Sequence, residues 1–371
     1  MAVDLKDGTK LQLDGKALDE ALQYSPSYGI PRLVAQLKSM QQQLHRPRSY
    51  ASADEWAVMV CNGSQDGEEK AFQMILDDGD GVICESPTYS GTIAALRPLR
   101  CNIVDVPCDK DGMDTEKLEK TLLTWPRGQP KPKLLYTIPT GQNPSGSTLS
   151  LDRRRHMLRL ADEHDFLIME DDPYYHLQFL EHGEERLPTL FELDTSARVL
   201  RFDSLSKVVS SGLRVGWATG PRFLVEKLQL HEQAANLCIS GLSQLVVSRL
   251  LEHWGMDGFL TQRDLVEREY RRRRDLFCSL ARRELSGLAH FDEPRAGMFL
   301  WMQLPNVASS ESLINQHAME ERVLLVPGTS FDPQGKPSNY VRASFSTASD
   351  AEMEEGLQRL KRALTRAAPA D

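Results

Sequence analysis

The sequence lacks the features of a disulfide-rich, metal-binding or membrane-spanning protein. Its six cysteines contain no C-x-x-C pair, and its nine histidines form no H-E-x-x-H motif. Cysteines spaced in this way indicate free thiols in a reducing compartment, and no metal site is predicted. No apolar run approaches the length of about 18 residues that a transmembrane helix requires. The first residues have neither a signal-peptide core nor an arginine-rich transit face, so we predict a cytoplasmic location.

The chain also lacks an excess of positive charge. Its 371 residues carry a formal net charge of −9, which argues against nucleic acid or a membrane surface as a partner. The most basic run, 271–274, is flanked by acidic residues and is interpreted as the solvated face of a long helix. Hydrophobic residues make up 40% and charged residues 26% of the sequence. These values are typical of a globular enzyme, and the length fits two domains.

What the sequence does have is an alternation of short apolar runs and amphipathic segments. Between about residues 56 and 220, runs rich in β-branched and aliphatic residues end at Gly, Pro, Asp or Asn. Helical patterns such as 151–165 separate several of these runs. This order predicts an α/β fold with a mainly parallel sheet that helices cover on both faces. Ligands of such sheets bind at the carboxyl ends of the strands.

The pattern changes after Gly220. Helical segments follow one another there, and a smaller α+β region with strands near 298–305 and 340–346 ends the chain. The predicted organisation is an N-terminal remnant at 1–23, a large ligand-binding domain at 24–250, and a connecting helix with a small C-terminal domain at 251–371.

Polar residues stand where several of the predicted strands end. Ser64 and Gln65 follow the first strand in a turn that begins a helix, which predicts either an anion site or a plain N-cap. Tyr89 follows the second strand and either stacks on a flat ring or covers an edge of the core. Asn143 precedes Pro144 in a glycine-flanked loop where a cis bond is allowed. It belongs either to an ordinary turn or to an amide held rigidly for a ligand.

Three acidic residues, Glu170, Asp171 and Asp172, end another apolar strand. Such a cluster is costly unless a cation or water solvates it. One interpretation is a solvated loop. In the other, the bend at Pro173 aims Asp171 and Tyr174 at one heterocycle.

Lys207 follows the strand that ends at Asp203, within the segment DSLSKVVSSGLRVG. A partly desolvated lysine near another cation has a lowered pKa and becomes an amine nucleophile for a carbonyl. Arg214 is such a cation, and Ser204 and Ser206 could complete a phosphate cradle. A purely structural lysine is the alternative.

Arg342 lies far downstream, in a predicted strand of the small domain. Its guanidinium suits a bidentate grip on a carboxylate, with an interdomain salt bridge as the alternative. Taken in order, this set resembles a fold-type I pyridoxal-phosphate (PLP) enzyme of the class I/II aminotransferase family. Segments including ALQYSPSYGIP, EDDPYYHLQF, DSLSKVVSSGLRVGWATGP and AGMFLWMQLP resemble its kynurenine/2-aminoadipate aminotransferase branch. The resemblance extends from about residue 24 to residue 364.

The resemblance implies a role for each residue around the cofactor ring. Lys207 would be the Schiff-base lysine that also moves the α-proton of the substrate. Asp171 would keep the pyridine nitrogen protonated, so that the ring accepts electrons. Tyr174 and Asn143 would hydrogen-bond the phenolic oxygen of the ring, and Tyr89 would stack on its face.

The resemblance also implies a phosphate site, a substrate site and a second subunit. Tyr24 matches a tyrosine that reaches the phosphate of the neighbouring subunit, which implies a homodimer with shared active sites. Arg342 would bind the substrate α-carboxylate, with Asn143 beside the substrate and Phe299 lining the side-chain pocket. The residues implied to hold the phosphate are Ser64, Gln65, Ser204, Ser206 and Arg214.

The implied reaction is a ping-pong transfer of the amino group of 2-aminoadipate, kynurenine or an aromatic amino acid to 2-oxoglutarate. A PLP-dependent C–S β-lyase on the same fold is one alternative. Another is a truncated PLP-binding chain with little turnover, because family members carry a specificity strip ahead of the ALQYSP segment. A missing presequence would leave a mitochondrial location open. A non-catalytic sensor behind a winged-helix domain is disfavoured, because the chain is acidic and shows no such domain.

Overall fold

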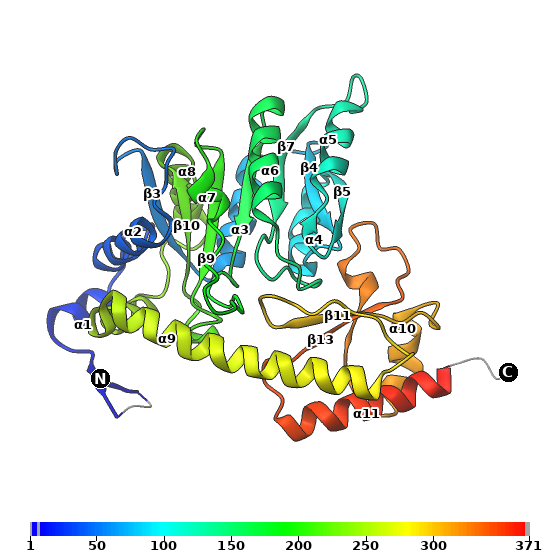
Figure 1. The fold of residues 1–371 in the computed structure, drawn as a ribbon. Coiled ribbons are helices and arrows are strands. Elements are labelled where there is room, and N and C mark those ends of the chain that lie inside the picture. The colour runs from blue at the N-terminus through cyan, green and yellow to red at the C-terminus, as the bar shows by residue number, and fades with distance from the viewer. Residues whose placement is uncertain (1, 6–7, 368–371) are drawn as a thin grey trace.

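The structure is a computed structural model that describes residues 2–5 and 8–367 of the chain. Figure 1 shows a large sheet with helices around it and a smaller sheet that lies over the second half of a long helix. The strands of the large sheet are β3 (Trp56–Cys61), β4 (Gly81–Ser86), β5 (Asn102–Asp109), β6 (Gly112–Met113), β7 (Pro132–Thr137), β8 (Leu167–Asp171), β9 (Val199–Ser204) and β10 (Gly216–Pro221).

The large sheet has the strand order β3-β10-β9-β8-β7-β4-β5-β6. Strands β5, β4, β7, β8 and β9 are mutually parallel. Strand β10 runs antiparallel to both of its neighbours, β3 and β9, and the short β6 runs antiparallel to β5. The prediction of a mainly parallel sheet is therefore confirmed, and the carboxyl ends of its parallel strands meet at one edge.

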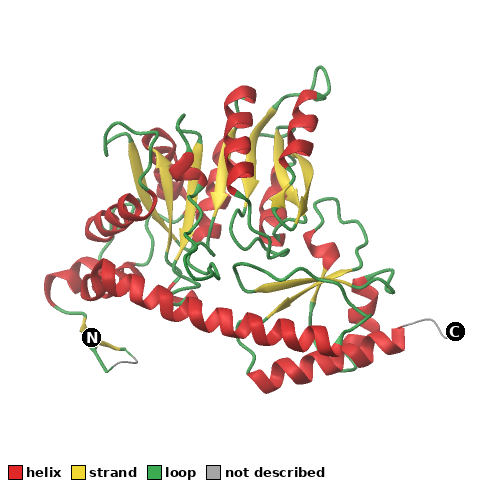
Figure 2. Ribbon diagram, viewed as in Figure 1, coloured by secondary structure: helices red, strands yellow, loops and turns green. Residues whose placement is uncertain are grey.

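Helices cover both faces of this sheet, as Figure 2 shows. One buried core contains Met59 of β3, Phe72 of α3 and Val225 of α8, and the other contains Leu37 of α2 and Met157 of α6. These two cores explain why the parallel strands read as continuous apolar runs. The helices concerned are α2 (Pro31–His45), α3 (Ser64–Ile75), α4 (Ser90–Leu96), α5 (Thr115–Leu123), α6 (Leu151–His164), α7 (Leu190–Leu193) and α8 (Arg222–Ala235).

The long helix α9 (Gly241–Glu284) runs beneath both sheets in Figure 1 and is kinked at Gly255, whose φ is 60°. The C-terminal helix α11 (Asp350–Ala367) packs against it. Helix α11 buries Met353, Leu357, Leu360 and Leu364, a spacing that places them on one helical face. The predicted domain boundary at residue 250 falls inside α9 and stays a prediction.

The small sheet has the order β11-β13-β12, with all pairs antiparallel. The sequence predicted strands β11 and β13 of this sheet but not the short strand β12. The N-terminal hairpin β1-β2 was not predicted either. The remaining elements are β1 (Ala2–Asp4), β2 (Lys10–Gln12), α1 (Gly15–Ala21), β11 (Phe299–Gln303), α10 (Ser310–Leu313), β12 (Val326–Pro327) and β13 (Tyr340–Ser344), with 3-10 turns at Arg97–Leu99, Ser211–Leu213 and Gly328–Phe331 and a π-helical turn at Ile314–Ala318.

Within residues 2–5 and 8–367, no helix is long and apolar enough to cross a membrane. The same part of the chain holds no cluster of His, Cys, Asp or Glu that could bind a metal ion. All six cysteines are free thiols, and Cys61, Cys84 and Cys278 are buried.

Candidate active site

The residue at the centre of the predicted site, Lys207, lies in the turn that follows β9. Its Nζ is 5.9 Å from the centroid of the Tyr174 ring. Burial lowers the pKa of Lys207; the charge of Asp171 opposes this shift, whereas Arg214 and Arg342 lower the pKa further. The lowered pKa expected from the sequence is therefore found, and its cause is desolvation beside two cations.

The turn between β3 and α3 forms a tight hollow against β10. Gly63, at a φ of 83°, precedes the first helical residue Ser64, and no side chain caps the helix there. The plain N-cap alternative for Ser64 is therefore wrong. A Cβ added to Gly216 would lie 2.6 Å from the Ser64 backbone nitrogen, so only glycine lets these backbones approach. The exposed N–H groups at the start of this helix suit a phosphate.

Arg214 closes the hollow from the loop before β10. Its Nη2 donates to the carbonyl oxygen of Asn62 at 3.2 Å, and its Nη1 lies 3.5 Å from the Ser206 hydroxyl. The Ser204 hydroxyl donates to Ser206 at 3.0 Å. Arg214, Ser204 and Ser206 are thus brought together beside the start of α3, as predicted, and the donors that surround the hollow match those that a phosphate requires.

Asp171, at the end of β8, is buried and only half satisfied. Its Oδ2 accepts a hydrogen bond from the Tyr136 hydroxyl at 2.7 Å, and no N–H or hydroxyl group among the residues described donates to its Oδ1. Burial raises the pKa of Asp171 to about 6, although Tyr136, Glu68, Lys207 and Arg201 lower it. An orphaned carboxylate oxygen in a buried site suits a cationic N–H donor such as a protonated pyridine nitrogen.

Arg342 reaches from β13 in the small sheet to the loop that follows β7. Its Nη1 donates to Asn143 Oδ1 at 2.8 Å, and its guanidinium lies 4.2 Å from the centroid of the Phe299 ring. The peptide bond between Asn143 and Pro144 is cis. No carboxylate pairs with Arg342 in the described part of the chain, so the salt-bridge alternative is not found there. Arg342 therefore keeps donors available for an incoming carboxylate.

Tyr174, Tyr89 and Gln65 are the other residues predicted to surround the cofactor. The Tyr174 hydroxyl is in hydrogen-bonding contact with Asn143, and burial raises its pKa. The pKa of Tyr89 is raised by burial and by Asp171 and Glu68, and lowered by Arg342 and Arg214. A Cβ on Gly91 would lie 2.5 Å from Gln65 Oε1 and would also meet the Tyr89 ring, so Tyr89 and Gln65 flank the same point.

Tyr24 is the one predicted site residue that the chain does not bring to this edge. It follows α1, its side chain is 77% exposed, and its backbone nitrogen bonds to the side chain of Gln23. Its role was predicted in a second subunit, and that role stays a prediction.

The other two acids of the β8 cluster lie on the opposite face of the sheet from Asp171. Successive side chains of a strand alternate between faces, so Glu170 and Asp172 point together toward Arg201. Nη1 of Arg201 is 3.2 Å from Glu170 and 2.9 Å from Asp172, and Nη2 is 2.7 Å from Asp203. All three acids of the cluster are buried, so the solvated-loop alternative is wrong.

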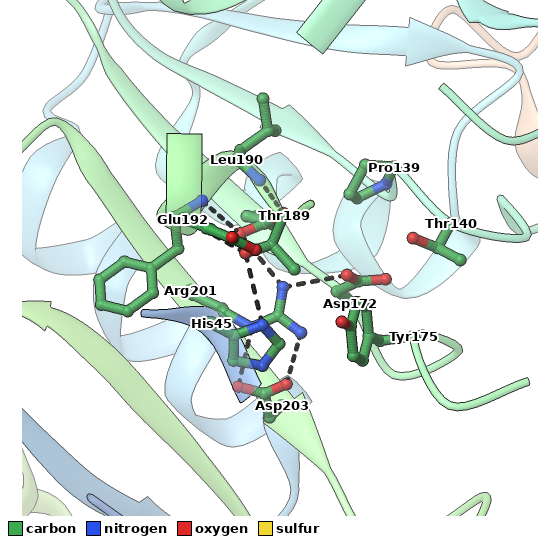
Figure 3. A network of polar contacts seen from close by, with 12 residues as sticks. His45, Pro139, Thr140, Asp172, Tyr175, Thr189, Leu190, Glu192, Arg201 and Asp203 are labelled. Atoms are coloured by element: carbon green, nitrogen blue, oxygen red, sulfur yellow. Dashed lines mark hydrogen bonds and ion pairs between the residues drawn. The ribbon is translucent and has the colours of Figure 1, made fainter. Parts of the chain in front are cut away.

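Figure 3 shows this network, with Arg201 between Asp172 and Asp203 and His45 beside it. Glu170 also accepts the backbone N–H groups of Leu190 and Phe191 at the start of α7. Burial and the Arg201 charge hold the pKa of His45 well below its usual range, so this imidazole is neutral and does not compete with Arg201. The network ties together the ends of β8 and β9, which carry Asp171 and lead to Lys207.

Sequence reasoning missed Tyr136, Glu68 and Arg201. Tyr136 and Arg201 lie inside buried strands, where no turn or loop marks them. Glu68 could have been found from the sequence, because it shares a helical face with Ala71 and Phe72, which are buried. An acid on the apolar face of a helix predicts a buried partner.

Comparison with known proteins agrees with this geometry. The family model of class I and II aminotransferases matches residues 6–360. The mitochondrial kynurenine/alpha-aminoadipate aminotransferase of Rattus norvegicus is 43% identical over 366 residues, which cover 96% of this chain and 85% of that protein. The 2-aminoadipate transaminase of Thermus thermophilus is 35% identical over 347 residues, which cover 93% of this chain and 82% of that protein.

A solved structure shares both the fold and the extent of the chain. The crystal structure of Pyrococcus horikoshii kynurenine aminotransferase, a complex with PMP, matches with a TM-score of 0.89 at 29% identity. The match covers 96% of this chain and 85% of that chain.

The residues present fit the PLP cofactor of this family. The hollow at Ser64 and Arg214 offers donors for a phosphate, the free oxygen of Asp171 suits a protonated ring nitrogen, and the lowered pKa of Lys207 suits an amine that meets an aldehyde. The chain belongs to the class I and II aminotransferases and is a PLP-dependent transaminase.

Proposed function

We propose that the protein transfers the amino group of 2-aminoadipate, kynurenine or an aromatic amino acid to 2-oxoglutarate in a ping-pong reaction. The observation that carries this proposal is the placement of Lys207, whose pKa is lowered, among Asp171, Tyr174 and Arg342. The names of the rat and Thermus relatives support the substrate class.

In this proposal Lys207 would be the Schiff-base lysine that holds the cofactor, and Asp171 would keep the ring nitrogen protonated. Bound PLP supplies an electron sink for the pair of electrons left at the substrate Cα. Tyr174 and Asn143 hydrogen-bond the phenolic oxygen, and Tyr89 covers the ring face. The phosphate is held by Ser64, Gln65, Ser204, Ser206 and Arg214.

The chain moves one proton and orients one carboxylate. The Nζ of Lys207, once the substrate amine has displaced it from the cofactor, would take the α-proton of the amino acid and return it on the cofactor side. The lowered pKa of Lys207 suits such a base. Arg342 holds the substrate α-carboxylate beside Asn143, to which it already donates. Phe299, against the Arg342 guanidinium, lines the pocket for the side chain.

We further propose a homodimer in which Tyr24 reaches the phosphate of the second subunit. The exposed position of Tyr24 supports this, because its ring is free to contact another chain. The proposed organisation is 1–23, 24–250 and 251–371, with α9 as the connection. The cytoplasm remains the predicted compartment.

The visible absorption spectrum tests this function directly. Wild type loaded with PLP should show a chromophore that bleaches on addition of 2-aminoadipate, whereas Lys207→Ala should show neither. Lys16→Ala, whose side chain is 91% exposed, is the matched control and should behave as wild type. A wild-type protein without a chromophore would contradict the role of Lys207. Reaction with aspartate or alanine alone would contradict the substrate class, and release of pyruvate from a cysteine conjugate would indicate a β-lyase.

A further inference from the structure

Glu68 is a buried acid that the proposed reaction does not use. It lies in the second turn of α3, with a residual exposure of 1%. Neither of its carboxyl oxygens has a hydrogen-bond donor at normal geometry in the described part of the chain. A buried carboxylate in this state is strongly disfavoured, so the group either holds a proton or lacks compensation.

The carboxyl group that Glu68 does contact is that of Asp171. The two side chains are in hydrogen-bonding contact, and two carboxylates at that separation cannot both be ionised in a buried site. The pair therefore shares one proton. Burial and the charge of Asp171 hold the pKa of Glu68 well above its usual range, whereas the contact with Glu68 lowers the pKa of Asp171. The proton therefore belongs to Glu68, which donates it to Asp171.

The charged groups around the pair also indicate that Asp171 is the ionised member. Lys207 and Arg201 lie near Asp171 and lower its pKa. The cation nearest to Glu68 along α3, Lys70, is engaged with Asp66 and Glu232 instead.

The remaining neighbours of the pair are neutral donors or further acids. Tyr136 of β7 donates to Asp171, and the nearby hydroxyl of Ser64 opposes the shift of Glu68 only in part. Tyr89, at the start of α4, faces both acids and is itself neutral because its pKa is raised. Glu85 of β4 has its own donors in Thr137 and Gln142. Glu68 therefore stays the protonated member of the pair.

We propose that Glu68 is a positioning residue whose protonated carboxyl donates a hydrogen bond to Asp171 and keeps Asp171 ionised as the acceptor for the ring nitrogen of PLP. This inference rests on the proposed role of Asp171. Without the donor, the buried Asp171 would hold its own proton more tightly and would accept less well from the ring. With the donor, Asp171 is compensated by Tyr136 and Glu68 together, and the lone pairs that remain on the carboxylate can accept from the ring nitrogen.

The apo-protein gives a test that needs no cofactor. The folded-state pKa of Glu68 is raised above its unfolded value of about 4.3, so its contribution to stability is present below that value and is lost as pH rises toward the folded pKa. Glu68→Gln cannot ionise. Its free energy of unfolding, measured in urea, should therefore fall less than that of wild type between acid and alkaline pH. Glu69→Gln, on the exposed side of the same helix, should follow wild type.

PLP affinity shows whether Glu68 acts as a hydrogen-bond donor or only fills space in the core. Glu68→Leu removes the donor and should weaken PLP binding roughly tenfold, as the loss of a hydrogen bond to a charged group does. Glu68→Gln keeps an N–H donor and should bind PLP nearly as wild type does. The spectrum of bound PLP should change with pH in Glu68→Leu over a range where that of Glu68→Gln does not.

Several results would overturn the inference. It is wrong if wild type and Glu68→Gln have the same pH dependence of stability, or if the two Glu68 variants bind PLP equally well or equally poorly. A wild-type chromophore that bleaches with 2-aminoadipate while both Glu68 variants match wild type would reject the inference and leave the proposed function intact. Loss of the wild-type chromophore would reject the proposed function, while the apo measurement would still decide the Glu68 pair.

Discussion

The two faces of β8 hold buried acids in opposite electrostatic conditions. On one face, Glu170 and Asp172 share the guanidinium of Arg201 with Asp203. On the other face, Asp171 and Glu68 contact each other through their carboxyl groups. Within the described residues they form no ion pair, and no N–H or hydroxyl group donates at normal geometry to Asp171 Oδ1 or to either Glu68 oxygen. Acids adjacent in the sequence therefore face very different surroundings, because a strand alternates its side chains.

The difference separates an internal support from a ligand site. A buried charge that is paired within the chain holds the backbone in place and needs no ligand to compensate it. A buried oxygen without a donor costs free energy, and such groups concentrate where a ligand supplies the missing partner. The paired face therefore holds the ends of β8 and β9, and the unpaired face is the one where we propose that the cofactor binds. The following substitutions test this division, beginning with the largest expected effect.

Arg201→Met breaks the paired face. It leaves the buried carboxylates Glu170, Asp172 and Asp203 without their cation, and loss of one partner of a buried ion pair costs about 3–5 kcal/mol. The free energy of unfolding of the apo-protein in urea is the measurement. Arg198→Met is the matched control, because its partly exposed pairs with Asp162 and Asp165 should contribute no more than about 1 kcal/mol. Equal losses of unfolding free energy in the two variants would show that the buried Arg201 network stabilises the protein no more than the partly exposed pairs of Arg198.

Asp171→Asn breaks the unpaired face. The rate of transamination should fall by roughly 10²–10³-fold, as it does when an enzyme loses a group that stabilises developing charge. The apo-protein should be nearly as stable as wild type, because the substitution removes a buried charge and breaks no ion pair. Asp172→Asn should do the reverse and lower stability with a smaller effect on rate. Steady-state rates and urea unfolding of both variants measure these effects. Equal changes of rate and of stability in the two variants would contradict the division between a support face and a cofactor face.

Tyr136→Phe sharpens the comparison by removing the hydroxyl that donates to Asp171 Oδ2. That donor lowers the pKa of Asp171, which stands at about 6 with Tyr136 in place, so its loss raises the pKa. PLP affinity should then begin to fall at a higher pH than in wild type as the solution is acidified. At neutral pH the affinity should be roughly tenfold weaker. Equilibrium dialysis across pH measures both, and an unshifted profile would show that Tyr136 does not control Asp171.

Gln41→Met should give the smallest effect. Gln41 Nε2 donates to Asp203 at 3.0 Å on the paired face, so its loss should cost about 1.5 kcal/mol of stability. PLP affinity should not change, because Arg201 still holds Asp203 with two hydrogen bonds. A change in PLP affinity without a loss of stability would show that Gln41, on the paired face, influences cofactor binding on the other face.

Much of the site could be predicted because its residues stand where strands end. Lys207, Asp171, Asn143 and Tyr89 each follow an apolar run, and a parallel sheet brings such ends to one edge. Arg342 was predicted from a strand of the small domain, and the structure places it against Asn143.

The residues that could not be predicted are those whose partners are set by packing. Which face of β8 received Arg201 depends on the neighbour relation of β8 and β9, and that relation is a property of the sheet order. Tyr136 acts across from β7, one strand away. Glu68 was visible as an acid on an apolar helical face, but its partner Asp171 became known only from the packing of α3 on β8.

The insertion of β10 between β3 and β9 sets the order in which the cofactor site can be assembled during synthesis. Cys61 at the end of β3 pairs with Gly216 at the start of β10, so the hollow beside Ser64 has no opposite wall until the chain has been made through β10. Contacts of such long sequence separation form late and slowly, because the loop between them must first be closed. A nascent chain that stops between Lys207 and Arg214 would carry Asp171 and Lys207 without Arg214, which holds the phosphate in our proposal. Acquisition of the cofactor is therefore expected only after residue 221 has joined the sheet.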